Sequence, residues 1–259
     1  LVYMNLDNER ANRIRLVVRD LKTGKEQDPS NNFLTPWQFK WSPDGNSILV
    51  FGWENNKRES EGYKGGVFKV NVKTGQTDKI FLLTDYKYNI PEDDSSPLSY
   101  LEWSKDGRSF YYLFYKDRLV KHNLETGEDM ILYQNSDFTP YVLDLSPNGK
   151  NLLFGLDYPG DHKNHLFTIP AEGGKEKAVC TAQESDIEWV KYSPDGKYIY
   201  FVELPESTKS NLWRVPAEGG NPEKVWSSDN RVEIYDIHPD GNQVALSIRE
   251  RSSELRVIE

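Results

Sequence analysis

Four side chains with metal-binding chemistry gather in one short segment of the sequence, residues 157–165. They are Asp157, Asp161, His162 and His165. Carboxylate oxygens and imidazole nitrogens are common ligands of divalent metals. The chain contains only 4 histidines, however, and His122 and His238 fall in a predicted strand and a predicted hairpin turn. We therefore interpret 157–165 as a polar loop, and we predict neither a metal site nor a cofactor.

A second segment, TDYKYNIPEDDSSP at 84–97, combines aromatic and acidic residues. One interpretation is an aromatic and acidic lip for a basic or peptide ligand. The other is a solvated insertion that carries ordinary surface charge. Asp93 and Asp94 are adjacent and point apart, so they do not make an acid/base pair.

Nucleophilic catalysis finds no support in the sequence. There is no G-x-S-x-G segment, and no Ser, His and acid are placed by spacing as a triad. The single cysteine, Cys180, ends a predicted fourth strand (KAVCT) and suits a small buried or edge residue better than a nucleophile. Glycine pairs 173–174 and 219–220 fall in hairpins, so they do not form a phosphate loop. We predict no catalytic residue.

Composition excludes several classes of function. The net charge is -9 and no basic cluster is present, which argues against nucleic acid as a partner. One cysteine excludes an intrachain disulfide. No apolar run approaches the ~18–20 residues of a membrane span, so we expect no membrane insertion within this chain. The chain begins at Leu1 and not at Met, which leaves room for a removed leader, a preceding domain or membrane association through flanking segments.

One turn recurs along the chain and indicates which elements position these residues. It reads WSPDG, WSKDG, LSPNG, YSPDG and IHPDG, ending at Gly45, Gly107, Gly149, Gly196 and Gly241. Proline sets φ at the second turn position, Asp or Asn caps the turn, and Gly takes the positive φ that closes the hairpin. A second turn, Thr-Gly or Gly-Gly, follows each of the first four, and Thr23-Gly24 is an earlier copy.

Each repeat has room for four short strands, and no helical periodicity separates the copies. Repeated four-stranded units of ~40–50 residues are typical of a β-propeller. We therefore predict an all-β, six-bladed propeller in which the terminal blades are incomplete, formed by 1–259 as a single domain. The predicted blades are about 1–29, 33–83, 97–133, 139–180, 185–227 and 231–259.

A propeller carries its loops on two faces, and we expect binding on the face with the longer loops. The SPDG-type turns and the Thr-Gly or Gly-Gly turns share one face. The other, which we call the long-loop face, carries the segments 54–66, 84–97, 135–141 and 157–165. The candidate binding residues on it are Trp37, Trp53, Tyr63, Tyr86, Tyr88, Asp93, Asp94, Phe138, Tyr141, Tyr158, Asp161 and His162.

Three other tryptophans are explained better by packing than by ligand binding. Trp41 and Trp103 precede the turn at a position where other blades have Leu, Tyr or Ile, which indicates packing between blades. Trp213 lies in the middle of a predicted strand and suits the core.

The five turn segments, with NLWRVPAEGG (211–220) and HLFTIPAEGG (165–174), resemble the WD40-like repeats of the TolB-type β-propellers. The resemblance covers almost the whole chain and is specific for fold, because these residues build hairpins. In that family the repeat occurs in TolB, in lipoproteins and regulators of bacterial cell envelopes, and in propellers attached to prolyl-oligopeptidase-type serine peptidases. It implies a bacterial platform for a protein or ligand, in a periplasmic or otherwise extracytoplasmic setting; a cytoplasmic location is the alternative.

Three functions follow from these observations. The leading hypothesis is a non-enzymatic scaffold that recognises a protein or peptide through its long-loop face. The alternative is the gating propeller of a prolyl-oligopeptidase-type peptidase whose catalytic domain lies outside this chain. A lyase or lactonase would need His and carboxylates from several blades at equivalent loop positions, and the four scattered histidines offer little for it. The sequence indicates no oligomeric state.

Overall fold

The structure is a computed structural model of the 259-residue chain. It describes residues 2–7, 13–30, 34–54, 65–83, 98–114, 117–135, 137, 139–158 and 163–249.

Every element in the described residues is a β-strand, and the strands form six sheets in chain order. The first sheet contains β1 (Val2–Asp7), β2 (Arg13–Arg19) and β3 (Glu26–Gln27). The second contains β4 (Leu34–Trp41), β5 (Ser47–Glu54), β6 (Gly65–Asn71) and β7 (Thr77–Leu82). The third contains β8 (Leu98–Trp103), β9 (Ser109–Phe114), β10 (Arg118–Asn123) and β11 (Asp129–Gln134).

The remaining sheets repeat this organisation. The fourth contains β12 (Thr139–Leu145), β13 (Asn151–Tyr158), β14 (Lys163–Pro170) and β15 (Lys177–Thr181). The fifth contains β16 (Ile187–Tyr192), β17 (Tyr198–Glu203), β18 (Ser210–Pro216) and β19 (Glu223–Ser228). The sixth has two described strands, β20 (Arg231–Ile237) and β21 (Val244–Arg249).

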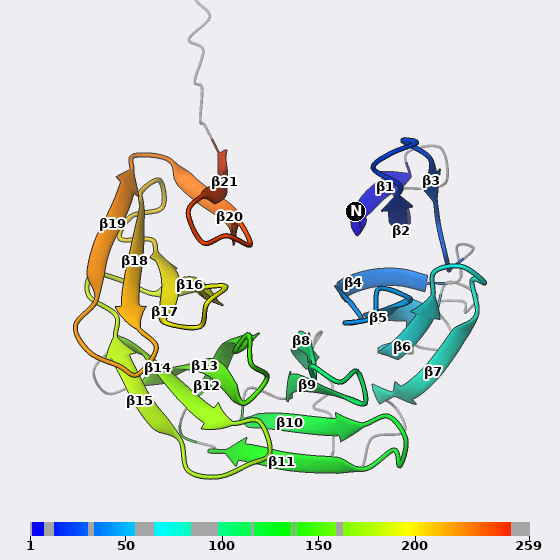
Figure 1. The fold of residues 1–259 in the computed structure, drawn as a ribbon, viewed down its shortest axis with the longest axis horizontal. Helices are drawn as coiled ribbons and strands as arrows, with labels where there is room; N and C mark the ends of the chain where they lie inside the picture. The colour runs from blue at the N-terminus through cyan, green and yellow to red at the C-terminus, as the bar shows by residue number, and fades with distance from the viewer. Residues whose placement is uncertain are drawn as a thin grey trace, which may run out of the picture. The chain divides into compact units, whose positions relative to one another are not determined.

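The six sheets are the blades of a six-bladed β-propeller, which confirms the predicted fold class. In each blade the strands lie side by side in chain order (Figure 1). The four middle blades have four strands each, while the first has three. Residues 250–259, the remainder of the range predicted for the last blade, lie outside the described residues. All strands lie within the predicted blade ranges to within one residue.

The chain divides into two compact units. Unit 1 is Leu1–Tyr115 with Leu119–Ile131, and unit 2 is Lys116–Arg118 with Leu132–Glu259. Unit 1 contains the first two blades and most of the third. Unit 2 contains the last three blades.

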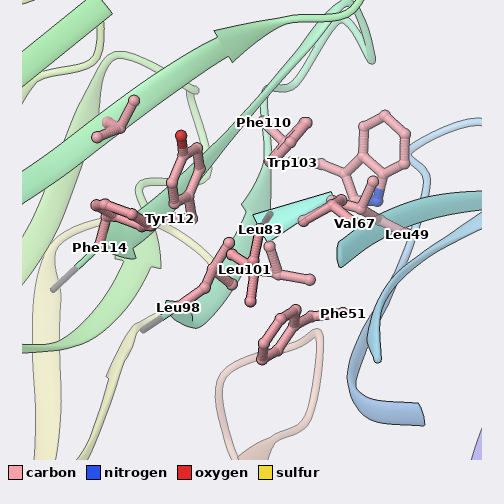
Figure 2. Packing of buried hydrophobic residues seen from close by; sticks show 11 residues of the cluster. Leu49, Phe51, Val67, Leu83, Leu98, Leu101, Trp103, Phe110, Tyr112 and Phe114 are labelled. Carbon is pink, nitrogen blue, oxygen red and sulfur yellow. The ribbon is translucent and has the colours of Figure 1, made fainter. Parts of the chain in front are cut away.

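Aromatic packing joins the second and third blades within unit 1. Strand β9 is buried along its whole length, as expected for a strand covered on both faces. Its side chains meet those of β5, β6 and β8 in one cluster (Figure 2). Trp103 is only 3% exposed, and its indole Nε1 donates to the backbone oxygen of Lys40 at 3.1 Å. The predicted role of Trp103 in packing between blades is confirmed.

Unit 2 has an equivalent core between its fifth and sixth blades. Val202 and Leu212 pack against Val232, Tyr235 and Ile237. The hydroxyl of Tyr235 donates to the backbone oxygen of Tyr200 at 2.8 Å, which satisfies the polar end of a buried ring. Trp213 is buried in the fifth blade, as the sequence predicted.

The recurrent turn is closed by its serine as well as by its glycine. In the third blade, Ser104 Oγ donates to Asp106 Oδ1 at 2.7 Å and accepts the backbone N–H of Ser109 at 2.9 Å. Gly107 has φ +71°, a conformation that Gly adopts at little cost. The same serine contacts occur in the second, fourth and fifth blades. In the sixth blade His238 takes the serine position, with its Nδ1 2.8 Å from Asp240 Oδ1.

These hydrogen bonds hold the turn aspartates in their charged form. The Ser42 hydroxyl, followed by the backbone N–H of Asn46, lowers the pKa of Asp44 to about 2. The pKa of Asp106 is lowered first by the backbone N–H of Arg108, and that of Asp195 first by the Ser193 hydroxyl. The turn is therefore a charged, hydrogen-bonded unit at neutral pH.

We predict that Ser104→Ala destabilises the protein by about 1–3 kcal/mol, because it leaves the buried N–H of Ser109 without its partner. Denaturant unfolding of both proteins measures the change. The matched variant His238→Ser installs the serine that the sixth blade lacks and should be neutral or stabilising. Equal unfolding midpoints for Ser104→Ala and the wild type would contradict this role.

We also predict a loss of stability in acid that depends on the turn aspartates. Their folded-state pKa values lie below the usual range, so their stabilisation is present above about pH 4 and is lost as the pH falls toward 2. Asp44→Asn should make this loss shallower and keep the turn, as Asn148 does in the fourth blade. Melting temperatures between pH 6 and 2.5 provide the measurement; identical slopes for variant and wild type would refute the assignment.

Candidate functional site

The first strand of each of the last five blades carries a β-bulge at the end away from the recurrent turn. The register shifts leave one residue unpaired in each strand. These bulge residues are Trp37, Tyr100, Val142, Glu188 and Glu233. A bulge interrupts the alternation of a strand and redirects a side chain, and bulges are common beside functional sites. Tyr100 and Val142 also have positive φ, +54° and +51°, which is rare for a β-branched residue such as Val142.

Trp37 and Trp53 form an aromatic pair at the bulged end of the second blade. Their ring centroids are 5.7 Å apart with planes at 88°, an edge-to-face arrangement. Trp53 also contacts the buried ring of Phe51, with centroids 5.8 Å apart. Trp37 is 52% exposed, so its ring is half in solvent while it packs against Trp53.

Glycines make room for this tryptophan pair. A Cβ on Gly52 would lie 2.3 Å from the backbone oxygen of Thr35, and one on Gly65 would lie 3.2 Å from Trp53 Nε1. Gly52 therefore allows the bulged strand β4 to approach β5, and Gly65 leaves space for the indole of Trp53. The position of Trp37 is set by backbone packing within one blade.

In the fifth and sixth blades the bulge residues are acidic and lie near arginines. Glu233 Oε1 is 2.9 Å from Arg249 Nε and 3.6 Å from Arg231 Nε. Glu188 Oε1 is 3.6 Å from Arg231 Nη2. The bulge position is thus aromatic in the second and third blades (Trp37 and Tyr100) but acidic in the fifth and sixth.

At the opposite end of the first strands, the residue two positions before the serine (or His238) of the recurrent turn is charged in all five copies. These residues are Lys40, Glu102, Asp144, Lys191 and Asp236. Lys40 pairs with Glu102 of the next blade at 2.6 Å, and Lys191 pairs with Asp236 of the next blade at 2.6 Å. Asp144 Oδ2 accepts the backbone N–H of Tyr192 at 2.7 Å. Our sequence interpretation missed these links, although aligning the five turn segments would have shown the charged column.

Only part of the predicted binding set can be placed. Trp37 and Trp53 are brought together as described. The candidates outside the described residues are Tyr63, Tyr86, Tyr88, Asp93, Asp94, Phe138, Asp161 and His162. Tyr158 ends β13, and its side chain is also outside the described set. The ring of Tyr141 lies against Gly155. A Cβ at position 155 would lie 2.4 Å from Tyr141 Cζ, so the ring occupies the space that a larger residue would need.

The loop predicted at 157–165 is shorter than expected. Asp157 pairs with Asn164 and Tyr158 with Lys163, so the β13–β14 ladder continues almost to the hairpin end. Antiparallel pairing satisfies backbone groups that an open loop would leave to water. His165 consequently lies in a strand, with Nδ1 3.0 Å from Thr181 Oγ1. Across the described ranges, no group of three or more His, Cys, Asp or Glu side chains is arranged to hold a metal ion.

His122 lies in β10, as predicted, and is buried in an aromatic setting. Its Nδ1 is 2.8 Å from Asp129 Oδ1, and its ring centroid lies 4.9 Å from Phe110 and 5.5 Å from Phe81. These contacts join the third blade to β7 of the second blade. Aromatic packing and one polar contact therefore explain the presence of a buried histidine at this position.

Glu203 is buried and Cys180 is half-buried near it in unit 2. Burial, with a further contribution from the Glu203 charge, raises the pKa of the Cys180 thiol to about 12. Burial also raises the pKa of Glu203, whose carboxylate accepts the backbone N–H groups of Gln183 and Glu184 at 2.6 and 3.0 Å. The carboxylate of Glu203 thereby anchors the connection between the fourth and fifth blades. A thiol with this pKa is a poor nucleophile.

The fold defines a six-bladed β-propeller, and the similar solved structures include TolB proteins. TolB from Acinetobacter baumannii has a TM-score of 0.67 at 16% identity, and the match covers 94% of this chain and 56% of that protein. A protein assigned as TolB from Agrobacterium tumefaciens has a TM-score of 0.65 at 16% identity, with 97% and 90% covered. This chain therefore spans just over half the length of the Acinetobacter protein.

Propellers of other descriptions share the fold as well. A protein provisionally assigned as a 6-phosphogluconolactonase from Bacteroides uniformis has a TM-score of 0.61 at 17% identity, with 95% of this chain and 73% of that chain covered. No family model and no curated protein matches the sequence. At these identities the likeness shows the fold alone. Among the described elements, no helix is long and apolar enough to cross a membrane.

We predict that Cys180 reacts with iodoacetamide at least about 100-fold more slowly in the folded protein than in urea, because little thiolate forms at pH 8. Mass spectrometry of timed samples gives both rates. Comparable rates in the folded and unfolded chain would contradict the burial of this thiol.

Proposed function

We propose that this chain is a non-enzymatic, TolB-like binding scaffold that recognises a protein or peptide through its long-loop face. We place it in a bacterial, extracytoplasmic setting, which is what the resemblance to the TolB-type repeats implies. The rigid blades position the binding residues, and recognition belongs to the bulged ends of the first strands and the loops beside them.

The exposed Trp37 ring is the observation that carries this proposal. Large aromatic residues dominate the energetics of protein–protein interfaces, and tryptophan is enriched among the residues whose truncation weakens binding most. Trp37 is half exposed yet fixed against Trp53, so binding a partner would cost little side-chain ordering. An unrestrained surface tryptophan would lack this preorganisation.

Two further features support a protein or peptide as the ligand. In the fifth and sixth blades the acidic bulge residues Glu188 and Glu233 lie beside Arg231 and Arg249, and this mixture of charges suits a polar rim. In addition, a structure of a nidogen/laminin complex contains a propeller of similar fold, with a TM-score of 0.57 at 10% identity over 82% of this chain and 74% of that chain. That complex is an example of a propeller seen together with a protein.

We predict that Trp37→Ala weakens binding of a peptide ligand by about tenfold or more, since it removes a preorganised aromatic anchor. The probe is a peptide selected from a random display library on the immobilised chain. Its dissociation constant is measured by titration of a fluorescent copy. The variant should keep the wild-type melting temperature, because the Trp37 ring is half in solvent.

The matched control is Met130→Ala, which truncates a side chain of similar exposure on the outer strand β11. This variant should bind the peptide like the wild type. Equal affinity of the wild type and Trp37→Ala for every selected peptide would overturn the proposed site, as would a library that yields no specific binder.

A further inference from the structure

Two clefts of similar construction lie beside the recurrent turns, one in each unit. The cleft of unit 2, which we call the blade 4–5 cleft, has a volume of about 300 Å³. It is lined by Asn148, Thr168, Lys175, Lys177, Tyr192 and Glu218, among others. The cleft of unit 1, the blade 2–3 cleft, has about 330 Å³. It is lined by Asp44, Lys69, Trp103, Lys105 and Asp106, among others.

The two clefts share several equivalent lining positions. The turn residues Asp44 and Asn148 are equivalent, and so are the residues that precede the next turn, Trp103 and Tyr192. Both volumes lie at the lower end of the range for small-molecule sites. The propeller therefore forms two related clefts beside equivalent turns, and the side chains that differ decide what each cleft accepts.

The charges of the two clefts differ. In the blade 2–3 cleft two lysines face Asp44 and Asp106, and hydrogen bonds lower the pKa of both aspartates, so both are ionised at neutral pH. The blade 4–5 cleft is lined by Lys175, Lys177 and a single acid, Glu218, which pairs with Lys177. The second cleft has an excess of positive charge on a chain whose net charge is -9.

The blade 4–5 cleft lacks the turn carboxylate that Asp44 supplies in the other cleft, because Asn148 stands at that position. It stands where the second, third, fifth and sixth blades have aspartate. Its Oδ1 accepts both the Ser146 hydroxyl and the backbone N–H of Lys150 at 2.9 Å, as the aspartates do at the same point of their turns. These contacts place Nδ2, a hydrogen-bond donor, where an aspartate has its second oxygen.

Glu218, the acid that lines this cleft, is held by an exposed ion pair. Glu218 Oε2 lies 2.8 Å from Lys177 Nζ, but the Glu218 side chain is 92% exposed. Ion pairs this exposed contribute little stability, so an incoming anion can take over the lysine. Tyr192 adds a phenol whose pKa is raised, first by burial and then by Asp144, so it stays protonated as a donor.

We propose that the blade 4–5 cleft binds a small tetrahedral oxyanion of the phosphate class, either the free ion or the phosphate group of a small molecule. Lys175 and Lys177 supply positive charge, and Asn148 and Thr168 supply uncharged hydrogen-bonding groups. Glu218 competes for Lys177 when the site is empty of anion. This site is on the turn side of the blades, so it is separate from the proposed recognition of a protein through Trp37.

The test is isothermal titration of the full chain with inorganic phosphate at low ionic strength. We expect saturable binding with a dissociation constant of about 1 mM, for a site of two lysines and neutral donors. Asn148→Asp should weaken binding about tenfold, because it places a negative charge beside the anion. Lys177→Gln should weaken it by a similar factor. Glu218→Gln should strengthen binding severalfold, a gain that misfolding cannot produce.

Two controls separate this site from general effects. Lys69→Gln removes one lysine charge from the blade 2–3 cleft and should leave phosphate affinity unchanged. Trp37→Ala should also leave it unchanged, so failure of the proposed protein recognition and failure of this site are distinguishable. Melting temperatures show whether each variant is folded; Asn148→Asp restores the residue of the other turns and is expected to fold normally.

Further ligands identify the anion. Tighter binding of glycerol phosphate than of inorganic phosphate would identify a small phosphate ester as the ligand class, and the reverse would identify the free ion. Acetate binding as tight as phosphate binding would overturn the assignment of a tetrahedral anion. Absence of saturable phosphate binding by the wild type, or wild-type affinity in folded Asn148→Asp, would overturn the site itself.

Discussion

The blades depend on how their first hairpin is closed. A serine, an acidic or amide side chain and a glycine close it together. The serine hydroxyl accepts an N–H from the returning strand, while Gly45 and its equivalents take positive φ. Together these contacts fix the register between the first and second strands. A slip of one residue would move every side chain of a strand to the opposite face and expose the apolar set.

Because the register is fixed at the turn, both ends of the first strand acquire a defined chemistry. Near the turn, a charged residue links neighbouring blades, as Lys40 does with Glu102. At the other end a bulge releases one residue from the ladder, and Trp37 is presented there on the support of Trp53. One strand thus serves packing at one end and recognition at the other.

The repeat also explains why the fold says little about function. In a turn that follows the pattern, the serine hydroxyl and one aspartate oxygen are used in hydrogen bonds that close the turn, so these atoms have a structural role. Specific properties arise where a copy departs from the pattern. Asn148 changes the charge of a cleft, and the bulge residues range from Trp37 to Glu233 in otherwise equivalent strands. Structures of similar fold with different descriptions are consistent with this separation of scaffold and site.

The sequence by itself determined the propeller fold, the strand order within blades and the turn positions, because hairpin signals are local and recur five times. It also predicted the burial of Trp103 and Trp213 and grouped Trp37 with Trp53. Only the tertiary structure decided which of these rings is exposed, because exposure depends on space left by Gly52 and Gly65 in neighbouring strands. The links between blades, from Lys40 to Glu102 and from Lys191 to Asp236, join residues far apart in the chain. The local pattern shows that these positions are charged, but which residues pair is decided only when the blades pack side by side.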